Sequence, residues 1–163
     1  MMIFIWAEDL NHGIGFKGHL PWHLSSDMKF FKRMTTGNTL VSGSRTFLTY
    51  GKPLPHRKNI VLTTNRQKQY PEGVLVLHSV DDLLTYQEHH PEETIFISGG
   101  AKVFASLLPY VDELVRTRID HEFEVDTYMP TIDYSLFELV SSEPGVVDEK
   151  SPYPHFFDRF TRK

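Results

Sequence analysis

The sequence contains no cysteine. Disulfide bridges and zinc sites built on thiolates are therefore excluded, and folding must depend on a buried apolar core. The chain has 163 residues, of which 40% are hydrophobic, enough for such a core in one domain. We expect residues 1–163 to form a single domain, and the lack of cysteine agrees with a reducing, cytoplasmic location.

Long hydrophobic runs and an excess of basic charge are also missing. The formal net charge is −4, and no polybasic tract is present, which argues against nucleic acid and membrane surfaces as partners. The apolar stretch 1–7 is short, lacks a basic leader and runs directly into Glu8 and Asp9. We therefore expect neither a signal peptide nor a membrane span, and small molecules as partners.

Apolar runs of strand length recur along the chain. Several are almost continuously apolar, which is typical of strands covered on both faces. The predicted strands are residues 3–7, 39–43, 59–63, 74–78, 94–97, 113–119, 137–140 and 156–160. In the last of these, Phe156, Asp158 and Phe160 alternate, which predicts an antiparallel edge strand with one side in water.

Helical stretches separate the first strands. The predicted helices are residues 24–34, 44–50, 80–89 and 101–108, and either Ser25 or Ser26 is expected to cap the first of them. Strands and helices alternate in the first two thirds of the chain, and strands dominate afterwards. The sequence therefore predicts an α/β fold with a mixed, mostly parallel sheet flanked by helices. The Pro-rich segment 143–154 is expected to be a long hairpin connection.

Asp27 is the first candidate for chemistry. In the predicted helix, Leu24, Met28 and Phe31 fall at i, i+4 and i+7, and Asp27 lies on the same side. A carboxylate within an apolar stripe is costly unless it is paired or binds a ligand. Alternatively, Asp27 simply occupies the first turn, where the helix dipole favours an acid.

Glycine-rich segments are the next candidates. Three glycines within residues 13–18 predict a flexible loop, ending at Pro21-Trp22, that either closes over a ligand or is an ordinary surface connection. Backbone amides at the strand-to-helix junctions Gly43-Ser44 and Gly99-Gly100 could bind phosphate, although plain tight turns would look the same. In the Pro-stiffened segment 51–58, Arg57 could bind a carboxylate or remain solvated.

The nine histidines do not form a metal-binding pattern. His19 and His23 are four residues apart, but Pro21-Trp22 between them argues against a helix that would align them. Without cysteine and without an H-E-x-x-H motif, we expect no metal site. No G-x-S-x-G motif is present, so nucleophilic catalysis is not expected either.

In this order, these segments resemble the dihydrofolate reductase family almost from end to end. The resemblance depends most on Leu20-Pro21-Trp22 with Asp27 five residues after Trp22, on Pro53-Leu54-Pro55 with Arg57, and on Gly99-Gly100. Further matching residues are Ile5-Trp6-Ala7, Ile14-Gly15, Phe31, Gly43, Thr46, Phe104, Thr117, Asp126-Thr127 and Pro130.

The resemblance implies a single domain with an eight-stranded, mostly parallel mixed sheet, an antiparallel C-terminal strand and four helices. It implies NADPH as cofactor and hydride transfer to the pterin ring of 7,8-dihydrofolate, giving 5,6,7,8-tetrahydrofolate for one-carbon metabolism. It also implies a monomer, without an obligate protein partner, and a cis peptide bond at Gly99-Gly100.

The resemblance also assigns roles to residues. Asp27 would bind the pterin, with a pKa raised by desolvation and Thr117 hydrogen-bonded behind it. The proton for the ring nitrogen would come from Asp27 or from water admitted near Trp22 and Leu20. The other residues expected to contact the substrate are Ile5, Trp6, Ala7, Met28, Phe31, Lys32, Arg57 and Ser98. Those expected to contact NADPH are Ala7, Ile14, Gly15, Leu20, Gly43, Ser44, Arg45, Thr46, Thr63, Thr64, Asn65, His78, Gly99, Gly100, Ala101, Lys102, Val103, Phe104 and Thr127.

Three positions depart from the family's commonest pattern. Ser44 stands where many members carry an arginine that meets the adenosine 2′-phosphate, which leaves this contact to Arg45, Thr64, Arg66 or His78. Ser98 brings a hydroxyl to the pterin pocket, where an apolar residue is usual. Val125 replaces a frequent glycine and could stiffen the loop that supports residues 15–20.

Two alternatives remain open at this point. A pyrimidine reductase of riboflavin synthesis would share the fold and cofactor but should lack Asp27 in its P-W-x-x-x-x-D context. A nucleotide-binding regulatory module would lack turnover, and a desolvated acid on a helix face argues against it.

Overall fold

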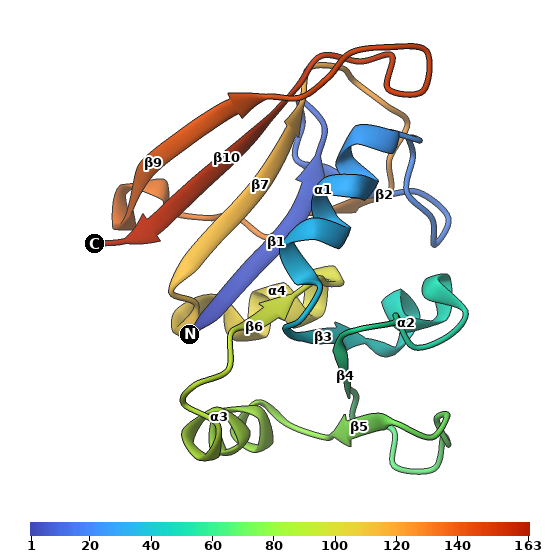
Figure 1. The fold of residues 1–163 in the computed structure, drawn as a ribbon, viewed down its shortest axis with the longest axis vertical. Coiled ribbons are helices and arrows are strands. Elements are labelled where there is room, and N and C mark those ends of the chain that lie inside the picture. Colours follow the sequence, from blue (N-terminus) through green and yellow to red (C-terminus); the bar gives the residue numbers. More distant parts are fainter.

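The computed structural model describes all 163 residues, and its main sheet contains eight strands (Figure 1). These are β1 (Met2–Glu8), β3 (Thr39–Gly43), β4 (Lys58–Leu62), β5 (Val74–Leu77), β6 (Ile95–Ile97), β7 (Glu113–Ile119), β9 (Phe137–Pro144) and β10 (His155–Arg162). Their order across the sheet is β5-β4-β3-β6-β1-β7-β10-β9. β10 is antiparallel to both neighbours and all other pairs are parallel, which is the sheet that the resemblance implied.

Four helices connect the strands. They are α1 (Ser25–Thr35), α2 (Ser44–Tyr50), α3 (Val80–His89) and α4 (Ala101–Leu107). The bounds of α2 and α3 are as predicted. α4 ends one residue earlier than predicted, because the chain tightens into a 3₁₀ turn, η1 (Leu108–Tyr110), that contains a proline. A second 3₁₀ turn, η2 (Tyr134–Leu136), precedes β9. None of the helices combines the length and the apolar composition needed to cross a membrane.

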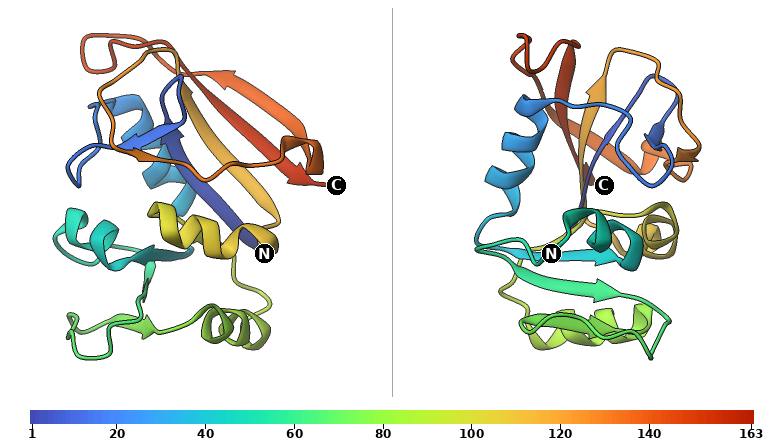
Figure 2. Two further views of the ribbon diagram at one scale, coloured as in Figure 1. Left: turned by 180° about the vertical axis from the view of Figure 1, so that it is seen from behind. Right: turned by 90° about the vertical axis from the view of Figure 1, so that its right-hand side faces the viewer.

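The sheet is covered on both faces. Successive side chains of a strand point to opposite faces. Along β1, Ile3 and Ile5 therefore join a small core that Phe31 of α1 packs against, whereas Phe4 joins a larger core with Phe104 of α4. The right-hand view of Figure 2 shows α1 and α4 on opposite sides of the strands. The face under α1 is the one that carries the candidate site.

The C-terminal strand differs from its prediction. β10 is not an edge strand, because β9 continues to Pro144 rather than ending near residue 140 and pairs along β10. Asp158 is consequently buried, at 2% exposure, and lies between Arg116 and Arg118 instead of facing water. The alternation of apolar and polar residues here reflects a buried ion pair. The connection between β9 and β10 is the long hairpin that the proline content predicted.

Two short strands were not predicted. β2 (Gly13–Gly15) and β8 (Thr127–Tyr128) pair antiparallel in a separate two-stranded sheet. Part of the glycine-rich segment is therefore held in a strand, and the prediction of a flexible loop is wrong for Gly13–Gly15. The pairing joins segments more than 100 residues apart, which the local composition does not indicate.

The cap of α1 also differs from its prediction. The N-cap residue is Leu24, which offers no side-chain hydrogen bond, so neither Ser25 nor Ser26 caps the helix. The N–H groups of these two serines instead donate to the carbonyl of Lys150 (3.1 Å) and the hydroxyl of Ser151 (2.9 Å). A distant part of the chain thus satisfies the start of the helix.

Candidate active site

Asp27 lies in the first turn of α1 and faces strand β7. The hydroxyl of Thr117 donates a 2.7 Å hydrogen bond to Oδ1 of Asp27, which is the contact that the resemblance implied. Burial raises the pKa of Asp27, while the Thr117 hydrogen bond and the charge of His155 act to lower it. An acid whose pKa is raised by desolvation holds a proton closer to neutral pH, as a proton donor or a charge-balancing group requires.

Apolar side chains cover the sheet face beneath α1. Ile5 and Val115 are buried on this face, and Phe31 of α1 packs against them. Met28, which the spacing placed in the buried stripe, is instead 54% exposed. The side chain of Trp6 lies on the opposite face, where its indole N–H donates to Glu8, so only its main chain is available to the site.

Trp22 lies three residues before the start of α1. Its side chain is buried and packs on Phe123, with ring centroids 5.2 Å apart. Its buried indole Nε1 has no acceptor within the protein. Buried N–H groups are almost always paired, so this donor fits a bound water or ligand atom. Leu20, two residues earlier, is 57% exposed.

Arg57 stands at the other end of α1. Its Nε donates to the carbonyl of Pro55 (2.9 Å) and its guanidinium to the hydroxyl of Thr35 (3.2 Å). Burial lowers the pKa of Arg57, although the guanidinium stays charged at neutral pH. Thr35 follows Asp27 by eight residues, about 12 Å along a helix. The carboxyl group of Asp27 and the guanidinium of Arg57 therefore lie near opposite ends of α1.

Aromatic and hydroxyl groups lie between these charges. The rings of Phe31 and Tyr50 are 6.4 Å apart, which suits an aromatic or apolar middle section of a ligand. The phenol of Tyr50 donates to Ser98 at 2.9 Å. Ser98 follows β6 on the face of Phe96, so its hydroxyl does reach this side of the sheet, and Tyr50, which the sequence did not single out, is its partner.

Strands β3 and β6 are neighbours, but their connections run in opposite directions across the sheet. The chain leaves β3 through α2 towards β4, and it leaves β6 through α4 towards β7. Ligands of open α/β sheets bind at such a switch point, beyond the carboxyl ends of the strands. Both of the glycine junctions predicted from the sequence lie there.

Because Gly43, Gly99 and Gly100 have no side chains, a ligand can approach the backbone closely at the switch point. The N–H of Gly43 donates to the carbonyl of Gly99 at 2.7 Å, and the Gly99-Gly100 peptide bond is cis, as expected. A Cβ on Gly43 would lie 3.1 Å from Val103, and Gly99 has a φ of 111°, which favours glycine. This surface suits close approach of a pyrophosphate, and it fits the dinucleotide that the family resemblance implied.

The other residues expected to hold a cofactor follow neighbouring parallel strands. Ser44 and Arg45 follow β3, Thr63 and Thr64 follow β4, and His78 follows β5. Arg45 and Thr64 are exposed, whereas Nδ1 of His78 bonds the carbonyl of Thr63 at 2.8 Å. Because carboxyl ends of parallel strands meet at one edge of a sheet, these groups border a common surface. Asn65, Ala101, Lys102 and Phe104 follow at the same junctions.

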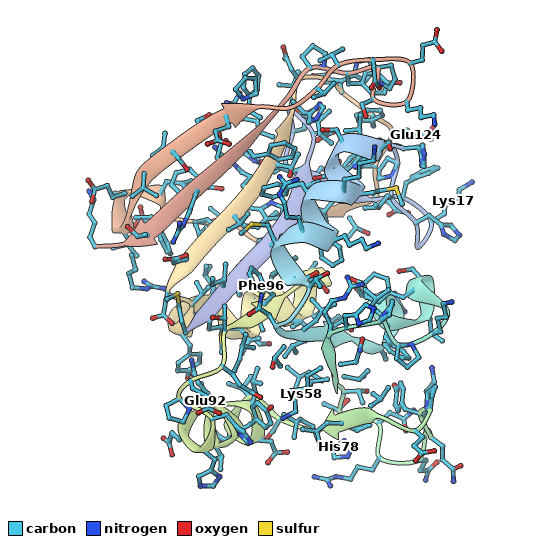
Figure 3. The ribbon with its side chains drawn as sticks, in the orientation of Figure 1. Lys17, Lys58, His78, Glu92, Phe96 and Glu124 are labelled. Carbon is cyan, nitrogen blue, oxygen red and sulfur yellow. The ribbon has the colours of Figure 1, made fainter.

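The segment 13–20 is held by residues 125–128. Figure 3 shows Lys17 at the upper right of the molecule and His78 near its lower end. The N–H of Lys17 donates to Asp126, and Thr127 lies against Gly15. Val125 packs so closely on Gly13 that a Cβ there would lie 2.6 Å from it, and the stiffening of this loop by Val125 stays a prediction.

Sequence reasoning missed several groups around Asp27. His155 is buried and lies 3.0 Å from the hydroxyl of Ser26, and Ser151 bonds the N–H of Ser26. These contacts join residues more than 120 positions apart, and no local motif indicates them. No group of three or more His, Asp or Glu side chains is arranged to hold a metal ion.

Comparison with known proteins agrees with this geometry. A family model described as dihydrofolate reductase matches residues 1–162. The dihydrofolate reductases of Bacillus subtilis and Enterococcus faecium are each 44% identical over 163 residues, covering 100% and 99% of this chain and 95% and 97% of theirs. The solved dihydrofolate reductase from Enterococcus faecalis, complexed with NADP(H) and RAB-propyl, superposes with a TM-score of 0.94 at 49% identity, covering 100% of this chain and 96% of that one. The chain therefore belongs to the dihydrofolate reductase family.

Proposed function

We propose that this enzyme reduces 7,8-dihydrofolate to 5,6,7,8-tetrahydrofolate with NADPH, and that Asp27 binds and helps to protonate the pterin. The role of Asp27 is assigned from its half-buried carboxyl group, which accepts a hydrogen bond from Thr117. Burial raises the pKa of this group. NADPH, when bound, supplies the hydride.

The residues of α1 and its neighbours fit the three parts of dihydrofolate. Asp27 would pair with the exocyclic amino group and a ring nitrogen of the pterin, as a two-point carboxylate contact. Phe31 and Tyr50 would flank the aromatic middle section. Arg57 would bind a carboxylate of the glutamyl tail, with the exposed Lys32 nearby.

Protonation of the ring nitrogen depends on Asp27 and its surroundings. A carboxyl group with a raised pKa favours the protonated pterin electrostatically, whether it delivers the proton itself or through water. Trp22 supplies a free buried N–H beside the site, which could hold such a water. Leu20 would exclude bulk solvent from the nicotinamide side.

The cofactor would lie across the switch point. Ala7, Ile14 and Gly15 would border the nicotinamide, and the bare backbone at Gly43 and Gly99-Gly100 would face the pyrophosphate. Thr46 and Val103 would line the same surface. In the absence of an arginine at position 44, the 2′-phosphate would meet Arg45, with Thr64, Arg66 and His78 as further contacts.

We also propose that residues 1–163 act as one domain in the cytoplasm, as a monomer without an obligate protein partner. A negative net charge supports small molecules rather than nucleic acid or membrane as partners. Sedimentation of the purified protein tests the monomer directly, and a stable dimer would contradict it.

Loss of NADPH absorbance, measured with and without dihydrofolate, tests the reaction. We expect oxidation only when dihydrofolate is present, and slower oxidation of NADH at equal concentration. Cofactor binding without oxidation would contradict the proposal and favour a silent nucleotide-binding module. Oxidation with a pyrimidine of riboflavin synthesis instead of dihydrofolate would favour the alternative reductase.

A further inference from the structure

The turn of α1 that carries Asp27 is held from outside by the connection between β9 and β10. The N–H groups at the start of a helix have no partner inside it, and Leu24 offers no side-chain acceptor. Lys150 and Ser151 of the connection supply these acceptors. The hairpin connection therefore replaces the missing helix cap.

His155, the first residue of β10, holds the same turn by a second contact. Its ring is 1% exposed, with Nδ1 2.7 Å from the carbonyl of Tyr153 and Nε2 3.0 Å from the hydroxyl of Ser26. Because a carbonyl oxygen can only accept, Nδ1 must donate, and Nε2 of the neutral ring then accepts from Ser26. Ser26 is thus fixed at both its N–H and its hydroxyl.

Gly145 leaves room for the imidazole of His155. A Cβ at this position would lie 2.0 Å from Nε2 of His155, so the ring fills the space that a side chain would occupy. The N–H of Gly145 also donates to the carbonyl of His155 at 2.9 Å. On its other side the ring packs edge-on against Phe157, at 5.5 Å. The ring is thus confined beside Ser26.

We propose that His155 and Ser151 are positioning residues, which act through Ser26 to hold the carboxyl group of Asp27 against Thr117. Asp27 directly follows Ser26, so a displaced turn would displace the carboxyl group relative to β7. The inference rests on the proposed function, because it matters for turnover only if Asp27 acts on the pterin.

Electrostatics supports the same coupling. Burial raises the pKa of Asp27, and the Thr117 hydrogen bond, which depends on the position of this turn, opposes the rise. The other titratable side chains at this corner are Tyr153 before β10 and His121 after β7, whose rings are 4.5 Å apart. The connection also carries exposed charged residues, namely Asp148, Glu149 and Lys150.

The test is the pH dependence of single-turnover hydride transfer in His155→Phe and Gly145→Ala. Both variants should lower the limiting rate at low pH roughly three- to tenfold, because the carboxyl group is no longer held in place. Both variants should also move the midpoint to higher pH, because a displaced carboxyl group weakens the Thr117 hydrogen bond, which acts to lower the pKa of Asp27. His155→Gln, whose amide can still accept from Ser26, should recover part of the rate.

His90→Phe is the matched control. Nδ1 of His90 also bonds a tyrosine carbonyl, that of Tyr86 at 2.8 Å, but His90 lies at the C-terminal end of α3. We expect it to keep the wild-type profile. If folded His155→Phe and Gly145→Ala both keep the wild-type limiting rate and midpoint, the proposal is wrong, even if their melting temperatures fall.

Asp27→Asn in the same assay separates the role of Asp27 in the reaction from the positioning role of His155. If Asp27→Asn loses the wild-type profile while the His155 variants keep it, only the positioning role fails. If Asp27→Asn itself keeps the wild-type rate and profile, the assigned role of Asp27 fails, and the inference fails with it.

Discussion

The hydroxyl of Thr117 lies 2.7 Å from Oδ1 of Asp27 and joins the central sheet to the first turn of α1. Thr117 pairs with Ala7 of β1 on one side and with Phe157 of β10 on the other. Its position is therefore set by three adjacent strands. The carboxyl group of Asp27 is therefore held in place by a residue in the middle of the sheet.

Thr117→Val tests this hydrogen bond with almost no change in shape. Because the hydroxyl acts to lower the pKa of Asp27, its loss should raise that pKa further and move the pH midpoint of turnover upwards. We expect kcat/KM to fall about tenfold, the effect of one lost hydrogen bond to a charged group. Thr161→Val, on β10, is the control, and an unchanged midpoint in Thr117→Val would contradict the assignment.

The Tyr50–Ser98 pair predicts unequal effects of two small deletions. Ser98→Ala leaves the buried phenol of Tyr50 without its partner and should cost about 1–3 kcal/mol of unfolding free energy. Tyr50→Phe should cost less, because the Ser98 hydroxyl still faces the carbonyl of Val41 at 3.5 Å. Urea denaturation of both variants and the double variant measures the coupling, and simple additivity would show that the pair does not interact.

Arg45→Ala tests how the enzyme reads the 2′-phosphate without an arginine at position 44. If Arg45 meets that phosphate, the dissociation constant for NADPH should rise at least tenfold while that for NADH changes little. Lys163→Ala removes the same charge elsewhere and should alter neither. Equal losses for both cofactors in Arg45→Ala would show that it holds only the pyrophosphate.

The buried carboxylate of Asp158 predicts a pH-dependent contribution to stability. Burial alone would raise its pKa, but hydrogen bonds from Ser142, Arg118 and Arg116 outweigh this and hold the pKa below its ordinary value of 3.8. The stabilisation is therefore complete above about pH 4 and is lost as pH falls through the lower folded-state pKa. Asp158→Asn should cost about 3 kcal/mol at pH 7.

Denaturation at several pH values checks this prediction. The difference between wild type and Asp158→Asn should stay constant from pH 8 to pH 5 and shrink only in stronger acid. A difference that already shrinks between pH 7 and pH 5 would mean that the carboxylate is not held in its charged form by the two arginines.

Most of the main sheet could be predicted from the sequence, because several of its strands are almost continuously apolar and helical segments separate most of the first ones. The segments 39–43 and 113–119 became β3 and β7 with the predicted bounds. β2 and β8 could not be predicted, since two or three residues around glycine form a strand only when a distant segment pairs with them. The same holds for Asp158, whose burial depends on β9.

The candidate site was predicted as far as local patterns and the family resemblance reach. Asp27, Arg57 and the paired glycines were identified because each stands in a distinctive local context. His155, Ser151 and Tyr50 were not, because their contacts with α1 and β6 arise only in the folded chain. A serine before a helix usually predicts a cap, but here the acceptor comes from the C-terminal hairpin.

The central claim is that the carboxyl group of Asp27 promotes protonation of the pterin, and the pH profile of Asp27→Asn tests it most directly. Single-turnover oxidation of NADPH with dihydrofolate should be slower by orders of magnitude at pH 7 and should recover as pH falls, because solution protons then protonate the substrate. A rate that equals that of the wild type at pH 7 would contradict the claim, as would a slow rate that stays independent of pH.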